Sequence, residues 1–305
     1  MTTPFLERLR AGRPLVADGA TGTSYQEMGS EIGVAPEEWV YDRPEAVMAL
    51  HRAFIAAGSD IILTDTFGGT PLRMRESKYA DRALPLNRRA AELAREVTDG
   101  HPGVLIAGSM GPTGVLMEPY GELTHDAAVQ TFADQAAALT SGGVDLLVLE
   151  TFFALEEALA AVEGVRRVSD RPLVVSFSFD QGTRTMMGLS PTQMVKAIQP
   201  LKVTAIGANC GKSLQAMEAV TAEIAGLKAG IPLWVKPNAG LPRMDGDLAR
   251  YDTGPDTMAE YTTRFLALGA QIVGGCCGTS PSHVAAIAAV ARADRPVRPV
   301  EAPAL

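Results

Sequence analysis

Eight times along the chain, an apolar segment of strand length runs into a loop of glycine and polar residues and is followed by a helix pattern. Several of these segments are continuously apolar, which is typical of parallel strands that are buried on both faces. Eight strands that alternate with helices predict an α/β fold of the (β/α)8, or TIM barrel, type, since the rival doubly wound sheet usually has fewer strands. Barrels of this kind reach 305 residues as one domain, so we expect a single domain over residues 1–305. The expected strands lie within residues 14–22, 60–69, 103–112, 145–153, 172–180, 205–213, 232–240 and 271–280.

The segments between the expected strands carry start and stop signals of helices. Ser190 and Ser280 each precede a proline, so both are expected N-caps with proline at the first helical position. Ser213 is the expected N-cap of a third helix, which should stop at Gly230, and Gly58 should end an earlier helix.

Polar residues stand where each apolar segment gives way to its loop. Active sites of (β/α)8 barrels form at the C-terminal ends of the strands, so these residues are the expected site. They are Asp18, Asp65, Ser109, Glu150, Asp180, Cys210, Asn238, Cys276 and Cys277.

The chain has three cysteines, of which Cys210 follows the sixth expected strand, and Cys276 and Cys277 follow the eighth. On a barrel all three lie on the same rim, so their thiols can converge. Zinc favours thiolates, usually within a tetrahedron, and three protein ligands leave a fourth position open for catalysis. Glycines in the segment GGCCG let the backbone bend, so that neighbouring side chains reach one ion instead of opposite faces.

The cysteines also have alternative roles at this point. The adjacent pair could form a strained disulfide, or all three could be small buried side chains. Copper(I) and iron–sulfur clusters also favour sulfur, although a cluster normally has four cysteine ligands. A thiol that arrived as the fourth ligand of a metal would be held deprotonated, whereas a free thiol has a pKa of ~8.5. We therefore expect a site that activates a substrate thiol.

Charge and composition exclude several classes of function. The formal net charge is −8 and no basic run exists, so a nucleic-acid partner is not expected. The sequence has neither a signal-peptide core nor an apolar run of ~18 residues, so we expect no membrane association. Three cysteines do not make a disulfide framework, which favours a reducing, cytoplasmic location. None of the four histidines stands at an expected strand end, which argues against a zinc hydrolase with histidine ligands.

Six motifs, DGATGT, TDTFGG, LET, ANCG, PNAGLP and GGCCGTSP, together resemble the homocysteine S-methyltransferase family over nearly the whole chain. That family includes betaine–homocysteine methyltransferases, S-methylmethionine-dependent enzymes and the homocysteine half of cobalamin-dependent methionine synthase. The motifs PNAGLP and MGPTG are most similar to the last group. The resemblance implies a zinc-dependent enzyme that transfers a methyl group to the thiol of homocysteine and so forms methionine.

The resemblance also assigns metal ligands. It implies a Zn²⁺ ion on Cys210, Cys276 and Cys277, with the sulfur of homocysteine at the fourth position. Asn238 matches a residue that serves as an exchangeable fourth ligand when substrate is absent in methionine synthase-like members.

Substrate contacts follow from the same resemblance. Asp18 and Glu150 match acidic residues that hold the substrate ammonium, with helix capping or an ion pair at the barrel rim as the alternative. Ser109 is an expected substrate contact on the same rim. Backbone N–H groups are expected to face the substrate carboxylate at Gly19, Ala20 and Thr21.

Departures from the family bear on the methyl donor. Asp65 stands where the family commonly has asparagine, and Gly68 and Thr151 replace aromatic residues of the betaine enzymes. Aromatic cages hold quaternary ammonium groups, so betaine is less favoured here than S-methylmethionine, S-adenosylmethionine or a methylcorrinoid. Trp39 and Tyr41 are expected to pack structurally rather than to rebuild a cage.

Further expectations concern partners and loops. No corrinoid or folate domain follows the barrel in the sequence, so a methylcorrinoid would have to arrive on another protein. The family is often oligomeric, which leaves a homo-oligomer open. A different thiol or selenol acceptor, or a barrel that binds zinc or a thiol without turnover, are the alternative functions. Residues 111–124 and 239–257 are expected to form loops over the site.

Overall fold

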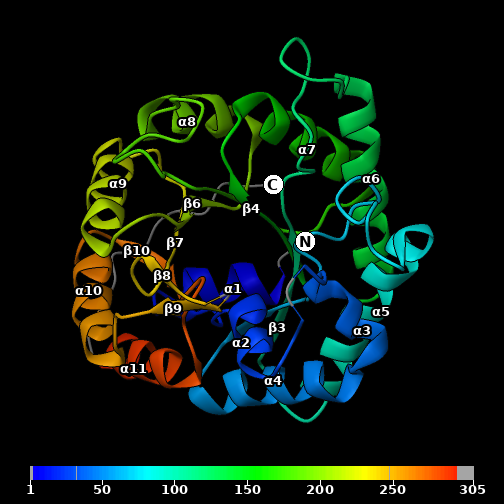
Figure 1. Cartoon of the computed structure of the whole chain (residues 1–305). Coiled ribbons are helices and arrows are strands. Elements are labelled where there is room, and N and C mark those ends of the chain that lie inside the picture. The colour runs from blue at the N-terminus through cyan, green and yellow to red at the C-terminus, as the bar shows by residue number, and fades with distance from the viewer. Residues whose placement is uncertain (1–2, 32, 247, 294–305) are drawn as a thin grey trace.

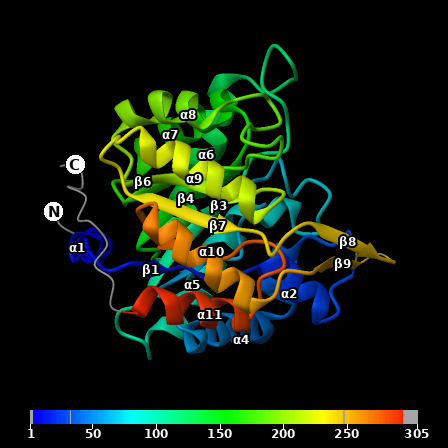
Figure 2. The ribbon, with the colours of Figure 1, turned by 90° about the vertical axis from the view of Figure 1, so that its left-hand side faces the viewer.

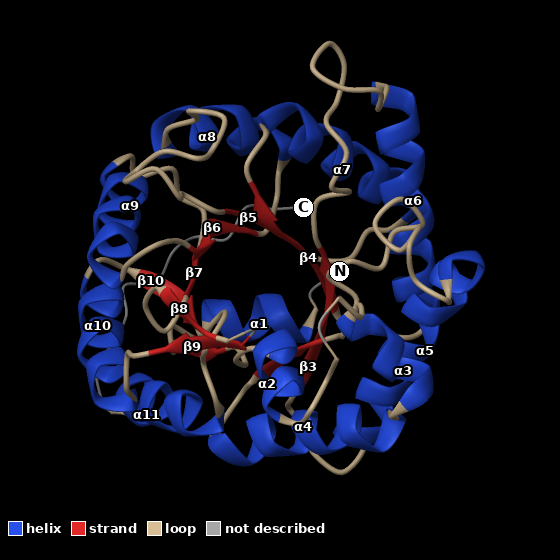
Figure 3. Ribbon diagram, viewed as in Figure 1, coloured by secondary structure: helices blue, strands red, loops and turns tan. Residues whose placement is uncertain are grey.

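Eight parallel strands form a barrel inside a ring of helices (Figures 1 and 3), which confirms the predicted (β/α)8 fold. The computed structural model describes residues 3–31, 33–246 and 248–293, so both ends of the predicted domain 1–305 lie outside the described residues. The strands follow the order β1-β10-β7-β6-β5-β4-β3-β2, and a parallel bridge between Ala17 and Ile61 joins the first to the last. Their bounds are β1 Leu15–Val16, β2 Ile61–Leu63, β3 Leu105–Met110, β4 Leu146–Phe152, β5 Leu173–Phe177, β6 Ala205–Cys210, β7 Leu233–Pro237 and β10 Ala270–Val273.

Helices follow the strands as the sequence predicted. Their bounds are α1 Pro4–Arg10, α2 Thr21–Glu27, α3 Trp39–Asp42, α4 Pro44–Ala57, α5 Ala83–Thr98, α6 His125–Ser141, α7 Leu155–Val168, α8 Pro191–Ile198, α9 Leu214–Gly226, α10 Pro255–Ala267 and α11 Pro281–Arg292. No helix of the described segments is long and apolar enough to cross a membrane.

Most of the predicted helix ends are confirmed. Ser190, Ser213 and Ser280 are the N-cap residues of α8, α9 and α11, and Gly58 ends α4 with a left-handed φ of 108°. The predicted stop at Gly230 is wrong, because α9 already ends at Gly226.

The early end of α9 has a local cause. The N–H groups of Leu227 and Lys228 bond to carbonyls only three residues back, so the last turn is tightened. Lys228 then takes a φ of 50°, which takes the backbone out of the helix before Gly230 is reached.

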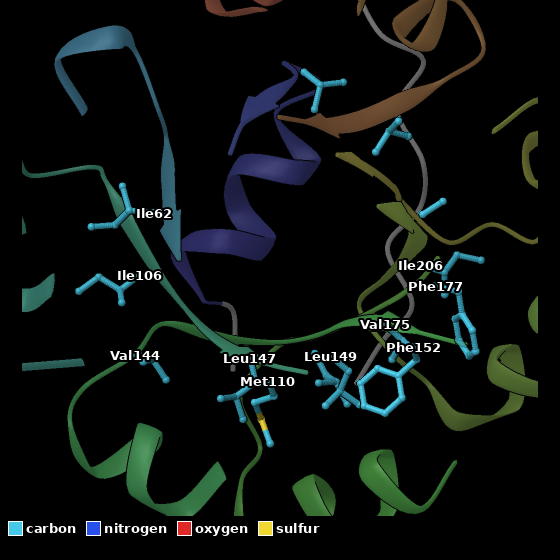
Figure 4. Packing of buried hydrophobic residues seen from close by; sticks show 14 of the residues in the cluster. Ile62, Ile106, Met110, Val144, Leu147, Leu149, Phe152, Val175, Phe177 and Ile206 are labelled. Atoms are coloured by element: carbon cyan, nitrogen blue, oxygen red, sulfur yellow. The ribbon is translucent and has the colours of Figure 1, made fainter. Parts of the chain in front are cut away.

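Alternation along each strand separates two apolar layers. In β4, Leu147 and Leu149 point outward to the helices (Figure 4). Leu146 and Val148 belong instead to a buried cluster with residues of all eight strands, and this cluster fills the barrel. Phe5 and Leu9 of α1 join that cluster. Figure 2 shows α1 at the end of the barrel opposite the hairpin of β8 (Pro242–Asp245) and β9 (Leu248–Tyr251). Helix α1 therefore covers the N-terminal end of the barrel, and the expected site lies at the opposite end, where the strands finish.

Carboxylates complete the seam between the short strands β1 and β2. Asp60 Oδ2 accepts from the N–H of Val16 at 2.9 Å, and Asp18 Oδ2 accepts from the N–H of Leu63 at 2.7 Å. Each carboxylate takes the place of a backbone carbonyl that the short strand does not supply. Asp18 is therefore fixed to the barrel wall.

The segment 239–257 is more ordered than the loop that we expected. It contains an antiparallel hairpin of β8 Pro242–Asp245 and β9 Leu248–Tyr251, with Pro242 opposite Tyr251. A Cβ atom at Gly278 would overlap the ring of Tyr251, so Tyr251 packs directly on the loop that carries the adjacent cysteines. The hairpin thus covers one side of the expected site.

Candidate active site

The three cysteine thiols converge at the C-terminal rim. Cys210 ends β6, whereas Cys276 and Cys277 lie in the loop after β10. Their sulfur atoms all lie within 4.8 Å of one another, and the Sγ atoms of Cys210 and Cys276 are 3.0 Å apart. All three are free cysteines rather than members of a disulfide. The predicted convergence is confirmed, and the cluster could hold a metal ion.

The donor set suits a thiophilic cation. Sulfur ligands of a tetrahedral zinc ion lie about 3.8 Å apart, given Zn–S distances of about 2.3 Å, and this spacing falls within the observed range. Hydrogen bonds from the thiols of Cys210 and Cys276 lower the pKa of Cys277 to about 3. The pKa of Cys210 lies well above its ordinary value, because its thiol donates to its two neighbours and a further negative charge beside them is unfavourable. A bound cation would remove this repulsion between thiolates.

Hydrogen bonds tie the two cysteine loops together around Asn238. Asn238 Oδ1 accepts from the N–H of Cys277, and Asn238 Nδ2 donates to the carbonyl of Gly211, both at 3.0 Å. The N–H of Cys276 donates to the carbonyl of Pro237 at 2.8 Å. Asn238 therefore positions both loops in this structure, and its service as an exchangeable metal ligand stays a prediction.

Left-handed backbone conformations mark the strand ends beside the cysteines. Cys210 has a φ of 60° and Thr151 has a φ of 64°, although neither is glycine. Such conformations cost about 1–3 kcal/mol and cluster at functional sites. The side chain of Asn209 contacts both residues.

Asp18 is engaged in a buried ion pair that the sequence did not predict. Lys236 Nζ lies 2.9 Å from Asp18 Oδ1, and the two side chains are only 3% and 2% exposed. Burial alone would lower the pKa of Lys236, but the negative charges of Asp18 and Glu150 raise it overall. The ion-pair alternative for Asp18 is thus what the structure contains. A lysine inside the apolar run PLWVKP was the available signal, because a buried lysine needs a partner.

Glu150 lies on the same side of the barrel. Its Oε1 atom accepts a hydrogen bond from the Ser109 hydroxyl. Burial raises the pKa of Glu150 to about 7, although the positive charge of Lys236 opposes this shift. Glu150 lies within β4 and not at a helix start, and a cationic group of a ligand would favour its charged form.

The glycine turn after β1 is only partly free to bind an anion. The N–H of Ala20 donates to the carbonyl of Thr279 at 3.0 Å, so this group is already engaged although Ala20 lines the cavity, and its contact with a substrate stays a prediction. Gly19 approaches Thr279 so closely that a Cβ atom would lie 2.7 Å from the same carbonyl oxygen. Gly19 and Thr21, the first residue of α2, both line the cavity.

A cavity of about 560 Å³ connects these groups. Its lining includes Ser109, Glu150, Lys236 and the three cysteines, together with Glu37, Asp65 and Arg73. Three of the predicted site residues, Asp18, Asp180 and Asn238, are not among its lining residues. Asp180 instead accepts a hydrogen bond from the Ser178 hydroxyl at 2.7 Å.

Two neighbouring carboxylates, Glu37 and Asp65, line the cavity. Glu37, in a short 3-10 helix over Pro36–Glu38, is 4% exposed, and Asp65 after β2 is also 4% exposed. Glu37 Oε1 accepts from the N–H of Gly68, whereas Asp65 Oδ2 has no hydrogen-bond partner among the described residues. Burial, followed by the neighbouring Glu37, raises the pKa of Asp65 well above its ordinary value. Glu37 was not predicted from the sequence, since it does not follow a strand.

The aromatic residues near this region pack structurally, as predicted. Trp39 is buried and stacks on Tyr25 at a centroid distance of 4.3 Å. Tyr41 contacts the edge of Tyr79 at 5.0 Å. Neither Trp39 nor Tyr41 lines the cavity.

Comparison with known proteins identifies the family. The family model described as homocysteine S-methyltransferase matches residues 15–291. The chain belongs to this family. It is 32% identical to the methionine synthases of Mycobacterium leprae and Mycobacterium tuberculosis, over 94% of this chain and 25% of each relative. The chain therefore spans about a quarter of the length of these relatives.

A solved structure has the same fold as this chain over nearly its whole length. The metallated form of the homocysteine methyltransferase MmuM from Escherichia coli is 25% identical, with a TM-score of 0.79. The likeness covers 94% of this chain and 99% of that structure.

Proposed function

We propose that this chain transfers a methyl group to the thiol of homocysteine and forms methionine. The observation that carries the proposal is the convergence of three cysteine thiols in the lining of a cavity that buried charged groups also line. Membership of the homocysteine S-methyltransferase family supports it, as does the similarity to methionine synthases and to a homocysteine methyltransferase. The cavity offers charged or polar groups to both ends of an amino acid, with the thiols beside them.

We propose zinc as the metal, held by Cys210, Cys276 and Cys277. Three sulfur donors, with no fourth cysteine in the chain, match a catalytic zinc site better than a structural one. When bound, zinc would keep the sulfur of the substrate as a thiolate at neutral pH. Thiolate ligands also require reducing conditions, in keeping with a cytosolic location.

The remaining groups would orient the acceptor. Glu150 receives the substrate ammonium, and Ser109 holds the carboxylate of Glu150 in place. Asp18 contributes less than predicted, because its charge is already shared with Lys236. Gly19 and Thr21 offer N–H groups to the substrate carboxylate, with Lys236 as a nearby positive charge.

For the donor, we propose a small cation such as S-methylmethionine. A donor that lay beside Glu37 and Asp65 in the cavity would stabilise both buried carboxylates with its positive charge. The sulfur of homocysteine forms a bond to the methyl carbon, and the bond between that carbon and the donor sulfur breaks. The electron pair stays on the donor, which leaves as a neutral thioether. A methylcorrinoid is the second candidate.

A donor panel tests the function directly. The zinc-loaded protein is incubated with homocysteine and, in turn, S-methylmethionine, S-adenosylmethionine, betaine and a methylcorrinoid, and methionine is quantified. We expect the highest rate with a sulfonium donor. Absence of methionine with every donor would refute the proposal, and binding of homocysteine without turnover would favour the non-catalytic alternative. Replacing homocysteine by different thiols or a selenol tests the acceptor.

Asp65→Asn tests the donor position. It restores the amide that the family commonly has and removes one buried negative charge. We expect the kcat/KM for S-methylmethionine to fall by at least about tenfold, the effect of losing about 1.4 kcal/mol. Asp180→Asn, outside the cavity lining, is the matched control and should leave kcat/KM unchanged. Equal activities of the parent and Asp65→Asn would remove Asp65 from donor binding.

The number of chains in the active protein is a separate question. A homo-oligomer, which the family resemblance leaves open, can be measured by sedimentation of the purified chain.

A further inference from the structure

The buried side chain of Asn209 lies between two strained backbone positions and two of the cysteine sulfurs. Asn209 is fully buried near the end of β6. Its Oδ1 atom accepts from the N–H of Thr151 at 2.9 Å and from the Ser176 hydroxyl at 2.6 Å. Its Nδ2 atom lies 2.6 Å from Thr151 Oγ1, 3.4 Å from Cys210 Sγ and 3.9 Å from Cys276 Sγ.

The orientation of this amide follows from its surroundings. A backbone N–H group can only donate, so the atom that faces the N–H of Thr151 must be the oxygen of Asn209. The amide nitrogen then has to face Thr151 Oγ1 and the two sulfurs. One N–H of that nitrogen faces Thr151 Oγ1, so the two sulfurs share the other N–H, which comes from a residue outside the proposed ligand set.

We propose that Asn209 is a positioning residue for the metal centre. It sets the direction of the Cys210 side chain and donates one N–H, which the thiolates of Cys210 and Cys276 share. This inference rests on the metal site of the proposed function but not on methyl transfer.

The backbone explains how Asn209 can reach the sulfur of its own neighbour. In a regular strand, adjacent side chains point to opposite faces. The left-handed φ of Cys210 turns its side chain away from that alternation, so that its sulfur meets the Asn209 amide. The same amide binds both the N–H and the hydroxyl of Thr151, the second strained residue. One side chain thereby holds two costly conformations, as the surroundings of a strained site must do.

Hydrogen bonds to a thiolate stabilise its charged form, which is the form that binds a metal. Residues that orient metal ligands in this way typically change metal affinity by about 10–100-fold when they are altered. Asn209 is the described residue whose side-chain nitrogen reaches two of the sulfurs, so it should have an effect of this size.

Asn209→Asp isolates the proposed contacts. An aspartate keeps an oxygen for the N–H of Thr151 and for the Ser176 hydroxyl, but it replaces the amide nitrogen beside the sulfurs with an acceptor. Ser176→Ala is the matched control, because it removes a hydrogen bond of Asn209 on the side away from the sulfurs. Asn209→Ser is a second variant that removes the amide without adding charge. Thermal melting of each metal-free protein checks folding.

Two readouts use metal alone, without donor or acceptor. Competition with a chelator gives the dissociation constant for Zn²⁺, and we expect it to rise about 10–100-fold in Asn209→Asp and Asn209→Ser but to stay unchanged in Ser176→Ala. Replacement by Co²⁺ gives the thiolate-to-cobalt absorption band. That band should move to lower energy in Asn209→Ser, because thiolates without N–H partners are better electron donors.

The two readouts separate positioning from mere scaffolding. A folded Asn209 variant with the parent's affinity for Zn²⁺ would overturn the proposal. Weaker binding with an unshifted cobalt band would also overturn it, since that result assigns Asn209 to the scaffold alone. Because neither readout involves methyl transfer, a parent protein that binds metal but makes no methionine would refute the proposed function and leave this inference standing.

Discussion

Replacement of Lys236 by methionine should destabilise the barrel strongly. The substitution keeps the length of the side chain but leaves Asp18, 2% exposed, with only the N–H of Leu63 as a partner among the described residues. Removal of one member of a buried ion pair costs about 3–5 kcal/mol, because the other charge stays buried without compensation. For a chain of 305 residues the unfolding entropy is about 0.6 kcal/mol/K, so the melting temperature should fall by about 5–8 °C.

Calorimetry of the metal-free protein measures this change without interference from metal binding. Arg88→Met is the control, because Arg88 pairs with Glu92 on the surface of α5 with a side chain 62% exposed. Exposed pairs contribute about 0–1 kcal/mol, so this control should melt within about 2 °C of the parent. The double variant Asp18→Asn with Lys236→Met removes both charges and should recover much of the loss. If Lys236→Met melts with the control, the ion pair does not stabilise the barrel.

Three more perturbations probe separate parts of the molecule. Gly207→Ala should prevent normal folding, since a Cβ atom there would overlap the backbone of Trp234. Gly254→Ala is the control, because a Cβ atom at that position meets nothing within 4 Å. Soluble yield and circular dichroism compare the two variants, and equal yields would contradict the packing argument. Cys210→Ala should lower bound zinc far below that of the parent in elemental analysis, and unchanged metal content would remove the three-thiolate site. Burial lowers the pKa of His51 from 6.5 to about 4, so the unfolded state takes up a proton before the folded state as the pH falls. The free energy of unfolding of the parent should therefore drop by about 3 kcal/mol between pH 6.5 and 4, whereas His51→Gln should not show this loss. Urea unfolding at a series of pH values measures the difference, and parallel pH profiles of the two proteins would rule it out.

Patterns local to each strand predicted the architecture and the cluster of three cysteines. Continuous apolar segments such as DLLVLETFF can be buried only between two layers, and their polar ends fall on one rim of a barrel. The convergence of Cys210 with Cys276 and Cys277 follows from that topology alone. To predict this convergence, the order of the strands along the chain was enough.

Contacts that depend on side-chain direction could not be predicted. Lys236 and Asp18 are 218 positions apart, and their pairing depends on how far each reaches into the barrel. The Thr279 carbonyl that accepts from the N–H of Ala20 belongs to the last loop of the barrel, and no local pattern specifies that contact. Asn209 reaches the sulfurs only because Cys210 adopts a left-handed φ, which no pattern of residue types specifies. Glu37 lies in the connection between α2 and α3 and not at the end of a strand, so the strand pattern did not point to it.

The position of β10 between β1 and β7 has a consequence for biosynthesis. During synthesis the barrel lacks one strand until residues 270–273 have left the ribosome. Cys276 and Cys277 follow that strand within a few residues. The strand that closes the wall therefore delivers two of the three thiols directly behind it. Nascent or shortened chains cannot assemble this cluster, so acquisition of metal by all three cysteines would report that synthesis has passed the last strand.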